Sequence, residues 1–223
     1  MIGIVIPACN EEQYLGKCLH YIRLAIQALP TLSQEVHVLV VLDSCNDQSL
    51  DIVQNAGVDY LQCNFGCVGK ARDLGVRHLI NSGSTWIACT DADTWVDTQW
   101  LIQQLNHQPV DAICGVVEVD SWRNFSILTR KNYLAHYQDV MNHSHIHGAN
   151  LSFSSTAYLQ TGGFEALCCH EDVDLIQRML NLNLKIIWSN LVRVKTSSRL
   201  NARAPEGFSS FLHQLERASS PIK

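Results

Sequence analysis

The sequence predicts an α/β fold in which an open, mostly parallel, doubly wound sheet is flanked by helices. Short apolar runs rich in β-branched residues alternate with segments of helical periodicity, and polar residues gather where the runs end. Strands separated in this way by helices pair in parallel through right-handed crossovers. The 223 residues suffice for one sizeable domain, which we divide into halves at 1–95 and 96–223.

The first half shows this alternation most clearly. Residues 2–6 are an apolar run interrupted only by Gly3, as expected of a strand buried on both faces. Apolar residues then recur with helical spacing and stop at Pro30. The same reasoning predicts strands at 36–42, 58–63 and 84–89, and helices at 49–55 and 69–80.

The second half has a looser periodicity. It predicts a helix that ends near Leu105, a strand at 111–119 and a helical stretch over 125–141. A short strand follows residues 147–150, and Glu171 with Asp172 opens another helix. Strands are expected at 185–188 and 191–194, and the tail at 219–223 is expected to fray.

Composition narrows the possible functions. The net charge is −5 and Lys and Arg form no dense run, which argues against a nucleic-acid-binding protein. Nine cysteines without a C-x-x-C pair favour reduced thiols and a cytoplasmic location. We expect no transmembrane segment, while peripheral membrane contact stays compatible with the sequence. Composition does not indicate an oligomeric state.

Acidic residues follow the apolar run at 86–89. Asp91 and Asp93 stand two apart, so both carboxylates can reach one hard divalent cation such as Mg²⁺ or Mn²⁺. Asp is also common in turns where strands end, which is the alternative explanation. In open α/β sheets, ligands bind at the carboxyl ends of the strands. Here those ends carry residues 7–12, 43–44 and 91–93.

Five short segments resemble, in order, the motifs of family 2 glycosyltransferases, which have the Rossmann-like GT-A fold and use nucleotide sugars. The resemblance covers nearly the whole chain. The segments are VIPACNEE at 5–12, VLDSCND at 41–47, GKARDLG at 69–75, DAD at 91–93 and HED at 170–172.

The resemblance implies an inverting, non-processive transfer from a nucleotide sugar, with a UDP-sugar as the expected donor, to the hydroxyl of a small or lipid-linked acceptor. It makes residues 1–95 the nucleotide-binding half and 96–223 the acceptor-binding half. The motif of processive members, Gln-x-x-Arg-Trp, is missing. The family's Asp-Asp-Gly-Ser turn is here Asp43-Ser44-Cys45-Asn46, which leaves the nucleotide open.

Roles for individual residues follow from this resemblance and from what a sugar nucleotide requires. A divalent metal, Mn²⁺ or Mg²⁺, is expected on Asp93 and Asp91 to stabilise the leaving diphosphate. A general base must accept the proton of the acceptor hydroxyl, and we expect Asp172, with Glu171 orienting the acceptor. The remaining candidates are Pro7, Ala8, Asn10, Glu11, Asp43, Arg72, Asp91 and Ala92 for the nucleotide sugar, His147 and His170 for the acceptor, and Arg199 and Arg203 for the diphosphate.

Several of these residues have simpler explanations. Asp43 could cap a turn, Arg72 could be a solvated helix charge, and Glu171 and Asp172 could merely favour a helix N-terminus. The alternating histidines 143, 145 and 147 invite a zinc site, but no strand signal supports an extended segment there. No third metal ligand is evident.

Two other functions compete with glycosyl transfer. A regulatory protein that binds a nucleotide sugar without turnover would keep the same pocket. A sugar-1-phosphate nucleotidyltransferase should begin with a glycine-rich phosphate loop, and residues 7–13 contain no glycine.

Overall fold

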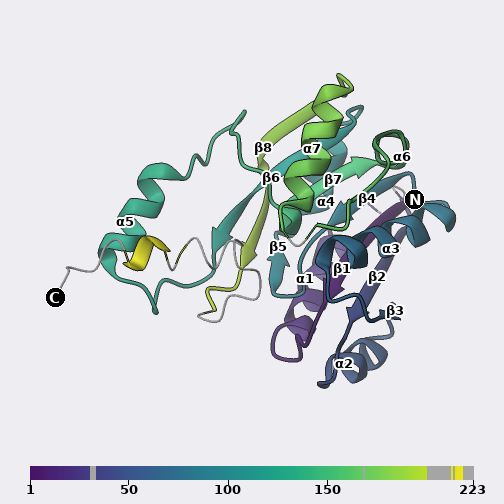
Figure 1. The fold of residues 1–223 in the computed structure, drawn as a ribbon, viewed down its shortest axis with the longest axis horizontal. Helices are drawn as coiled ribbons and strands as arrows, with labels where there is room; N and C mark the ends of the chain where they lie inside the picture. Colours follow the sequence, from purple (N-terminus) through teal and green to yellow (C-terminus); the bar gives the residue numbers. More distant parts are fainter. Residues whose placement is uncertain (31–33, 168, 200–211, 213, 218–223) are drawn as a thin grey trace.

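The computed structural model describes residues 1–30, 34–167, 169–199, 212 and 214–217, and within them eight strands form one sheet (Figure 1). The strands are β1 (Ile2–Ala8), β2 (Val36–Asp43), β3 (Asp59–Cys63), β4 (Trp86–Cys89), β5 (Thr94–Val96), β6 (Ala112–Val119), β7 (Leu151–Ser154) and β8 (Ile186–Thr196). Their order across the sheet is β3-β2-β1-β4-β7-β6-β8-β5. β1 pairs in parallel with both β2 and β4, and β2 with β3. The strands on the other side of β4 are mixed: β7 is antiparallel to both neighbours, β8 is parallel to β6, and β5 is antiparallel to β8.

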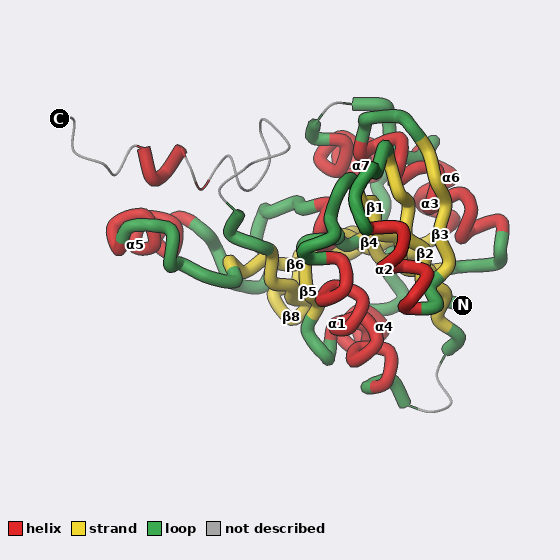
Figure 2. Tube along the Cα trace, turned by 90° about the horizontal axis from the view of Figure 1, so that it is seen from below, coloured by secondary structure: helices red, strands yellow, loops and turns green. Residues whose placement is uncertain are grey.

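Helices cover both faces of the sheet. They are α1 (Leu15–Gln27), α2 (Ser49–Ala56), α3 (Val68–Asn81), α4 (Trp100–Asn106), α5 (Ile127–His136), α6 (Ser155–Thr161) and α7 (Glu171–Asn181), with a 3-10 turn η1 at Gly148–Asn150. One apolar cluster joins the sheet to α1, α2 and α4, and a second joins it to α3, α6 and α7. Figure 2 shows α1 and α4 together on one side, away from α3, α6 and α7. The doubly wound α/β class is therefore confirmed.

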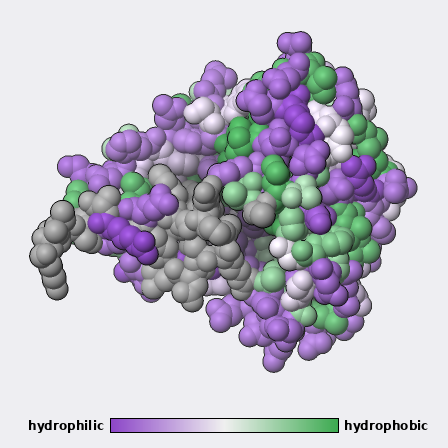
Figure 3. Space-filling view, in the orientation of Figure 1, coloured by the Kyte–Doolittle hydropathy of each residue, from purple (hydrophilic) through white to green (hydrophobic). Residues whose placement is uncertain are grey.

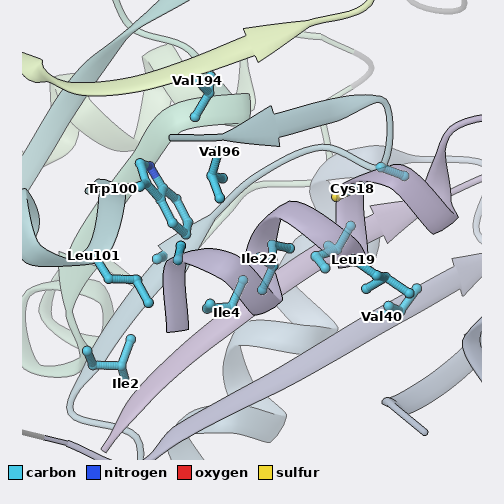
Figure 4. Packing of buried hydrophobic residues seen from close by; sticks show 14 of the residues in the cluster. Ile2, Ile4, Cys18, Leu19, Ile22, Val40, Val96, Trp100, Leu101 and Val194 are labelled. Atoms are coloured by element: carbon cyan, nitrogen blue, oxygen red, sulfur yellow. The ribbon is translucent and has the colours of Figure 1, made fainter. Parts of the chain in front are cut away.

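β1 shows how the strands serve both layers. Ile4 and Ile6 face the first cluster, whereas Val5 faces the second, because successive side chains of a strand point to opposite faces. In Figure 4, Ile4 lies beside Ile22 of α1, and Trp100 of α4 packs in the same layer. Burying a large apolar side chain of this kind stabilises the fold by about 1.5–3 kcal/mol. The carboxyl ends of the parallel strands are held rigidly as a result.

Two expectations for the second half were wrong in detail, and two short elements were not expected. The helical stretch over 125–141 is only α5, because the chain at Tyr137 turns to an extended conformation and its hydroxyl accepts the N–H of Val117. The expected strands at 185–188 and 191–194 are one strand, β8, whose pairing with β6 shifts between Gly115 and Val116. β5, which straddles the division at residue 95, and α6 were not expected.

None of the described helices combines the length and the apolar composition needed to cross a bilayer. On the face drawn in Figure 3, surface hydrophobic residues are interspersed with hydrophilic ones and gather mainly on the half that carries the parallel strands. α5 stands away from the sheet in both Figure 1 and Figure 2.

Candidate active site

The loops after β1 and β2 interlock at the carboxyl edge of the sheet. The backbone N–H of Glu11 donates to Ser49 Oγ at 2.9 Å, and the N–H of Asn46 donates to Asn10 Oδ1 at 2.7 Å. Asn10 has a φ of 53°, in the left-handed region that Asn tolerates better than most residues. Ala8 is buried in the first apolar cluster and Pro7 is half-buried. The candidate nucleotide loop therefore has a fixed backbone.

Asp43 holds the loop that leads into α3. Its carboxylate accepts the backbone N–H groups of Phe65, Gly66 and Cys67 at 2.7, 3.0 and 3.0 Å, and the hydroxyl of Ser44 at 3.0 Å. Burial raises the pKa of Asp43, but the three backbone N–H groups outweigh it, and the net pKa lies below the usual value. Asp43 is thus an ionised anchor for this loop, a contact that its position at a strand end did not predict.

Arg72 links the loop after β4 to the start of α7. Its guanidinium is buried, with Nη2 at 2.5 Å from Asp91 Oδ1 and Nη1 bonded to Glu171 Oε1. Burial alone lowers the pKa of Arg72, but Asp91 and Glu171 raise it, so the side chain stays charged. Burial raises the pKa of Glu171, and Arg72 opposes that rise. The surrounding backbone is fitted to the guanidinium, because a Cβ added at Gly148 would lie 2.5 Å from Nη1.

Asp172 stands beside this ion-pair network. It is half-buried in the first turn of α7, and its Oδ2 accepts the backbone N–H of Gly148 at 2.5 Å. The preceding residue, His170, is exposed and has a φ of 61°. The hydrogen bond from η1 holds one carboxylate oxygen of Asp172 in a defined position next to Glu171.

His147 precedes η1 and ties it to the segment after α5. The hydroxyl of Tyr137 accepts the N–H of Val117 and lies 3.1 Å from His147 Nε2, so its own proton can be donated to that nitrogen. Burial lowers the pKa of His147 to about 3, with His145 and His143 adding to the effect. His147 is therefore neutral, and the residue that follows it, Gly148, donates to Asp172.

A second arginine meets the other aspartate. Arg199 Nη2 lies 2.8 Å from Asp93 Oδ2, and its Nη1 lies 2.9 Å from Glu11 Oε1. Ser197 Oγ donates to the same oxygen of Asp93 at 2.7 Å, a contact that sequence reasoning missed. Burial raises the pKa of Asp93 to about 6, although Arg199 opposes the rise. Arg203, the other expected diphosphate ligand, lies outside the described residues.

These contacts form one connected network. Asp91 and Asp93 belong to the same loop, so the Arg72 and Arg199 ion pairs are neighbours along the chain. The loop that Asp43 anchors reaches the segment before α7, because Cys67 Sγ lies 3.3 Å from the carbonyl oxygen of Leu167. Ala92 packs into the first apolar cluster, so its backbone is the part left to face a ligand. The motifs therefore meet at one edge of the sheet.

The profile of a family described as Glycosyl transferase family 2 matches residues 3–171. The chain belongs to glycosyl transferase family 2, and it is therefore an enzyme. The matched region contains every candidate residue named above except those that follow residue 171. Among proteins with curated descriptions, none matches this family 2 member in sequence.

Several solved structures share this fold. TarS of S. aureus in complex with UDP-GlcNAc has a TM-score of 0.70 at 15% identity, covering 100% of this chain and 68% of that one. The mannosyltransferase PcManGT from Pyrobaculum calidifontis, in complex with GDP-Man and Mn²⁺, has a TM-score of 0.62 at 15% identity, with coverages of 95% and 68%. GalNAc-T7 with UDP, GalNAc and Mn²⁺ has a TM-score of 0.67 at 13% identity, with coverages of 89% and 44%. The chain spans only 42% of a longer TarS structure. At these identities the likeness is one of fold.

The carboxylates of this family 2 enzyme suit a divalent cation that shares its coordination with a substrate. Asp91 and Asp93 offer carboxylate oxygens at one loop, and the described residues hold no group of three His, Cys, Asp or Glu side chains around a common point. Mg²⁺ commonly needs only one or two carboxylates when substrate phosphates and water complete its shell. His143, His145 and His147 stack, with ring centroids 5.3 and 5.9 Å apart, instead of converging on a metal.

Proposed function

We propose that this enzyme transfers a sugar from a nucleotide sugar to an acceptor hydroxyl with inversion at the anomeric carbon, and that Asp172 is its general base. One observation carries the proposal: Arg72 joins Asp91 of the candidate diphosphate site to Glu171, the neighbour of Asp172. A donor held at Asp91 would thus present its reactive carbon near the carboxylate that must deprotonate the acceptor. The fold likeness to TarS bound to UDP-GlcNAc and to PcManGT bound to GDP-Man supports a nucleotide-sugar donor.

The donor's nucleoside would lie on the loops after β1 and β2, in the half formed by residues 1–95. Pro7, Ala8, Asn10 and Glu11 would supply the floor of its pocket. Asp43 already accepts three backbone N–H groups, so a ring N–H of the base would share a carboxylate that is oriented in advance. Uracil offers such a donor, and a UDP-sugar is the donor we propose.

The diphosphate would lie over Asp91 and Asp93 with Mn²⁺ or Mg²⁺ bound to their carboxylates. A bound cation supplies Lewis-acid stabilisation of the leaving phosphate. Arg199 occupies Asp93 in the structure, so its guanidinium must exchange that carboxylate for the diphosphate when donor and cation bind. Arg72 keeps its two ion pairs and orients Asp91 from behind.

The acceptor would approach Asp172 from the half formed by residues 96–223. The N–H groups of Gly148 and Val173 each donate to one oxygen of Asp172 and so orient the carboxylate, which would accept the hydroxyl proton as the acceptor oxygen attacks. His147 directly precedes Gly148, which donates to Asp172, and His170 stands two residues before Asp172; both are the proposed acceptor contacts. The acceptor is a small or lipid-linked molecule.

The proposal predicts that Asp172→Asn lowers kcat by about 10²–10⁴-fold without weakening donor binding, because the variant keeps the side-chain shape but loses the base. The measurement is transfer and hydrolysis of UDP-, GDP- and dTDP-sugars with Mn²⁺, alongside thermal shifts by the same ligands. Asp174→Asn is the matched control, since Asp174 lies in the same helix turn and pairs with Arg178 instead. Undiminished kcat in Asp172→Asn would remove the mechanism, and binding without turnover by the wild type would favour a regulatory protein.

A further inference from the structure

α5 turns an apolar face away from the rest of the molecule. Thr129 and Tyr133 point inward and are buried. Ile127 and Leu134 lie on the opposite side of the helix, with 89% and 60% of their surface exposed, and Leu128 lies on the flank between this side and the buried one, with 48% exposed. The helix stands apart from the sheet in both Figure 1 and Figure 2, so the sheet does not cover this face. Exposed apolar residues grouped on one helix face mark a contact surface.

The charged side chains of α5 and of residues 121–126 before it are all basic. Arg123, Arg130 and Lys131 are exposed, and residues 121–138 contain neither Asp nor Glu, although the whole chain has a net charge of −5. Glu216 accepts the backbone N–H of Ser126 at the N-terminus of the helix, which places this acid at one end of α5. Apolar side chains flanked by Lys and Arg suit an anionic lipid surface, where the charges meet headgroups and the apolar groups enter the boundary below them.

A second copy of the chain fits this face less well. A two-fold contact through α5 would bring the Arg130 and Lys131 side chains of both copies together, and like charges in an interface are repulsive. A stable interface also buries on the order of 800 Å² per partner, which three apolar side chains do not provide. An anionic membrane resolves both difficulties, because it supplies the opposite charge and an apolar layer of any extent.

We propose that α5 docks the enzyme on an anionic membrane surface, with Ile127 and Leu134 inserted below the headgroups, Leu128 at the edge of the contact, and Arg123, Arg130 and Lys131 among the lipid phosphates. The segment after α5 reaches the candidate active site, since Tyr137 contacts His147 at 3.1 Å. If the proposed glycosyl transfer holds, docking through α5 would bring an acceptor carried in the membrane toward Asp172. The docking itself does not depend on that transfer.

The test measures binding of the full chain to vesicles without donor or acceptor, so its outcome is independent of the proposed function. In cosedimentation, vesicles of phosphatidylcholine with about a quarter phosphatidylglycerol should bind the protein at least about 10-fold better than pure phosphatidylcholine, and raising the salt from about 50 to about 500 mM should reduce binding. The variant Ile127→Ser/Leu134→Ser should lose about 10-fold or more. The variant Arg130→Gln/Lys131→Gln should lose the preference for anionic lipid.

The matched control is Leu159→Ser/Leu182→Ser, which removes two leucines that are 53% and 43% exposed and lie away from α5. It should bind vesicles as the wild type does, and circular dichroism should be unchanged in all variants. Absence of binding to the anionic vesicles at low salt overturns the proposal, as does equal loss in the control. Self-association in sedimentation velocity that Ile127→Ser/Leu134→Ser abolishes, without vesicle binding, would assign the face to a second copy instead.

Discussion

Two arginines of the candidate site each bridge two carboxylates, yet they differ in how the chain holds them. Arg72 and its partner Glu171 both have only 5% of their side chains exposed, whereas Arg199 has 19% exposed and follows the last strand of the sheet. Arg72 sits in the first half of a long helix, between backbone segments that leave no spare room. The difference indicates that Arg72 is a fixed part of the site and that Arg199 is the group free to exchange partners.

The neighbours of the two arginines support this distinction. Gly148 and Gly69 both lack the space for a Cβ, because one would meet the Arg72 guanidinium and the other the carbonyl oxygen of Glu165. Arg199 contacts side chains, with Asp93 and Glu11 as ion-pair partners and the ring of Tyr14 at 5.9 Å. Side-chain contacts can reorganise without moving the backbone, so a ligand can displace Arg199 at modest cost.

The largest effect should come from Arg72→Ala. Removing this guanidinium leaves the buried carboxylate of Glu171 without its ion-pair partner and also takes one from the half-buried Asp91, which costs about 3–5 kcal/mol of unfolding free energy. Urea denaturation measures the loss. Arg77→Ala is the control on the same helix, since Arg77 makes a surface pair with Asp73 and should cost about 1 kcal/mol or less. Equal losses in the two variants would contradict a buried structural role for Arg72.

Asp93→Asn should stabilise the protein in a pH-dependent way. The folded-state pKa of Asp93 is about 6, above the usual value of 3.8, so the carboxylate costs stability as pH rises from about 4 to about 6. Asn carries no such charge. The variant should therefore match the wild type near pH 4 and exceed it by up to about 3 kcal/mol above pH 6, at about 1.4 kcal/mol per pKa unit. Denaturant titrations at several pH values test this, with Asp51→Asn on the surface of α2 as the control. If the difference in unfolding free energy between Asp93→Asn and the wild type were the same at all pH values, the raised pKa of Asp93 would be contradicted.

The smallest effect on stability should come from Arg199→Ala, about 1–2 kcal/mol, because Arg199 is 19% exposed and Asp93 can take up a proton when its partner is lost. The same change should instead strengthen Mn²⁺ binding by about 5-fold, since the cation no longer competes with a guanidinium for Asp93. Titration of Mn²⁺ followed by electron paramagnetic resonance measures the affinity. Lys195→Ala removes an equal charge from β8 at a side chain that is 58% exposed, and it should leave the affinity unchanged. Weaker Mn²⁺ binding in Arg199→Ala would show that Arg199 and Mn²⁺ do not compete for Asp93.

The fold of the first half was readable because its signals are local. The apolar run of β1, the helical spacing of α1 and the stop near Pro30 each lie within one element, and they predicted those elements closely. In the second half the decisive contacts are distant. α5 ends where it does because Tyr137 bonds to Val117 of β6. α6 has local signals, a cap at Ser154 and Gly162 at its end, but its seven residues are too few to show a helical periodicity.

The sequence by itself determined the family, the alternation of strands and helices, and the placement of acidic residues at the strand ends, because each of these depends on residues close together in the chain. Only the tertiary structure decided which charges meet. Arg72 bonds to Glu171, 99 residues away, and Ser197 to Asp93, 104 residues away. Such pairings depend on how the sheet and its helices pack in three dimensions, and no local sequence pattern determines that packing.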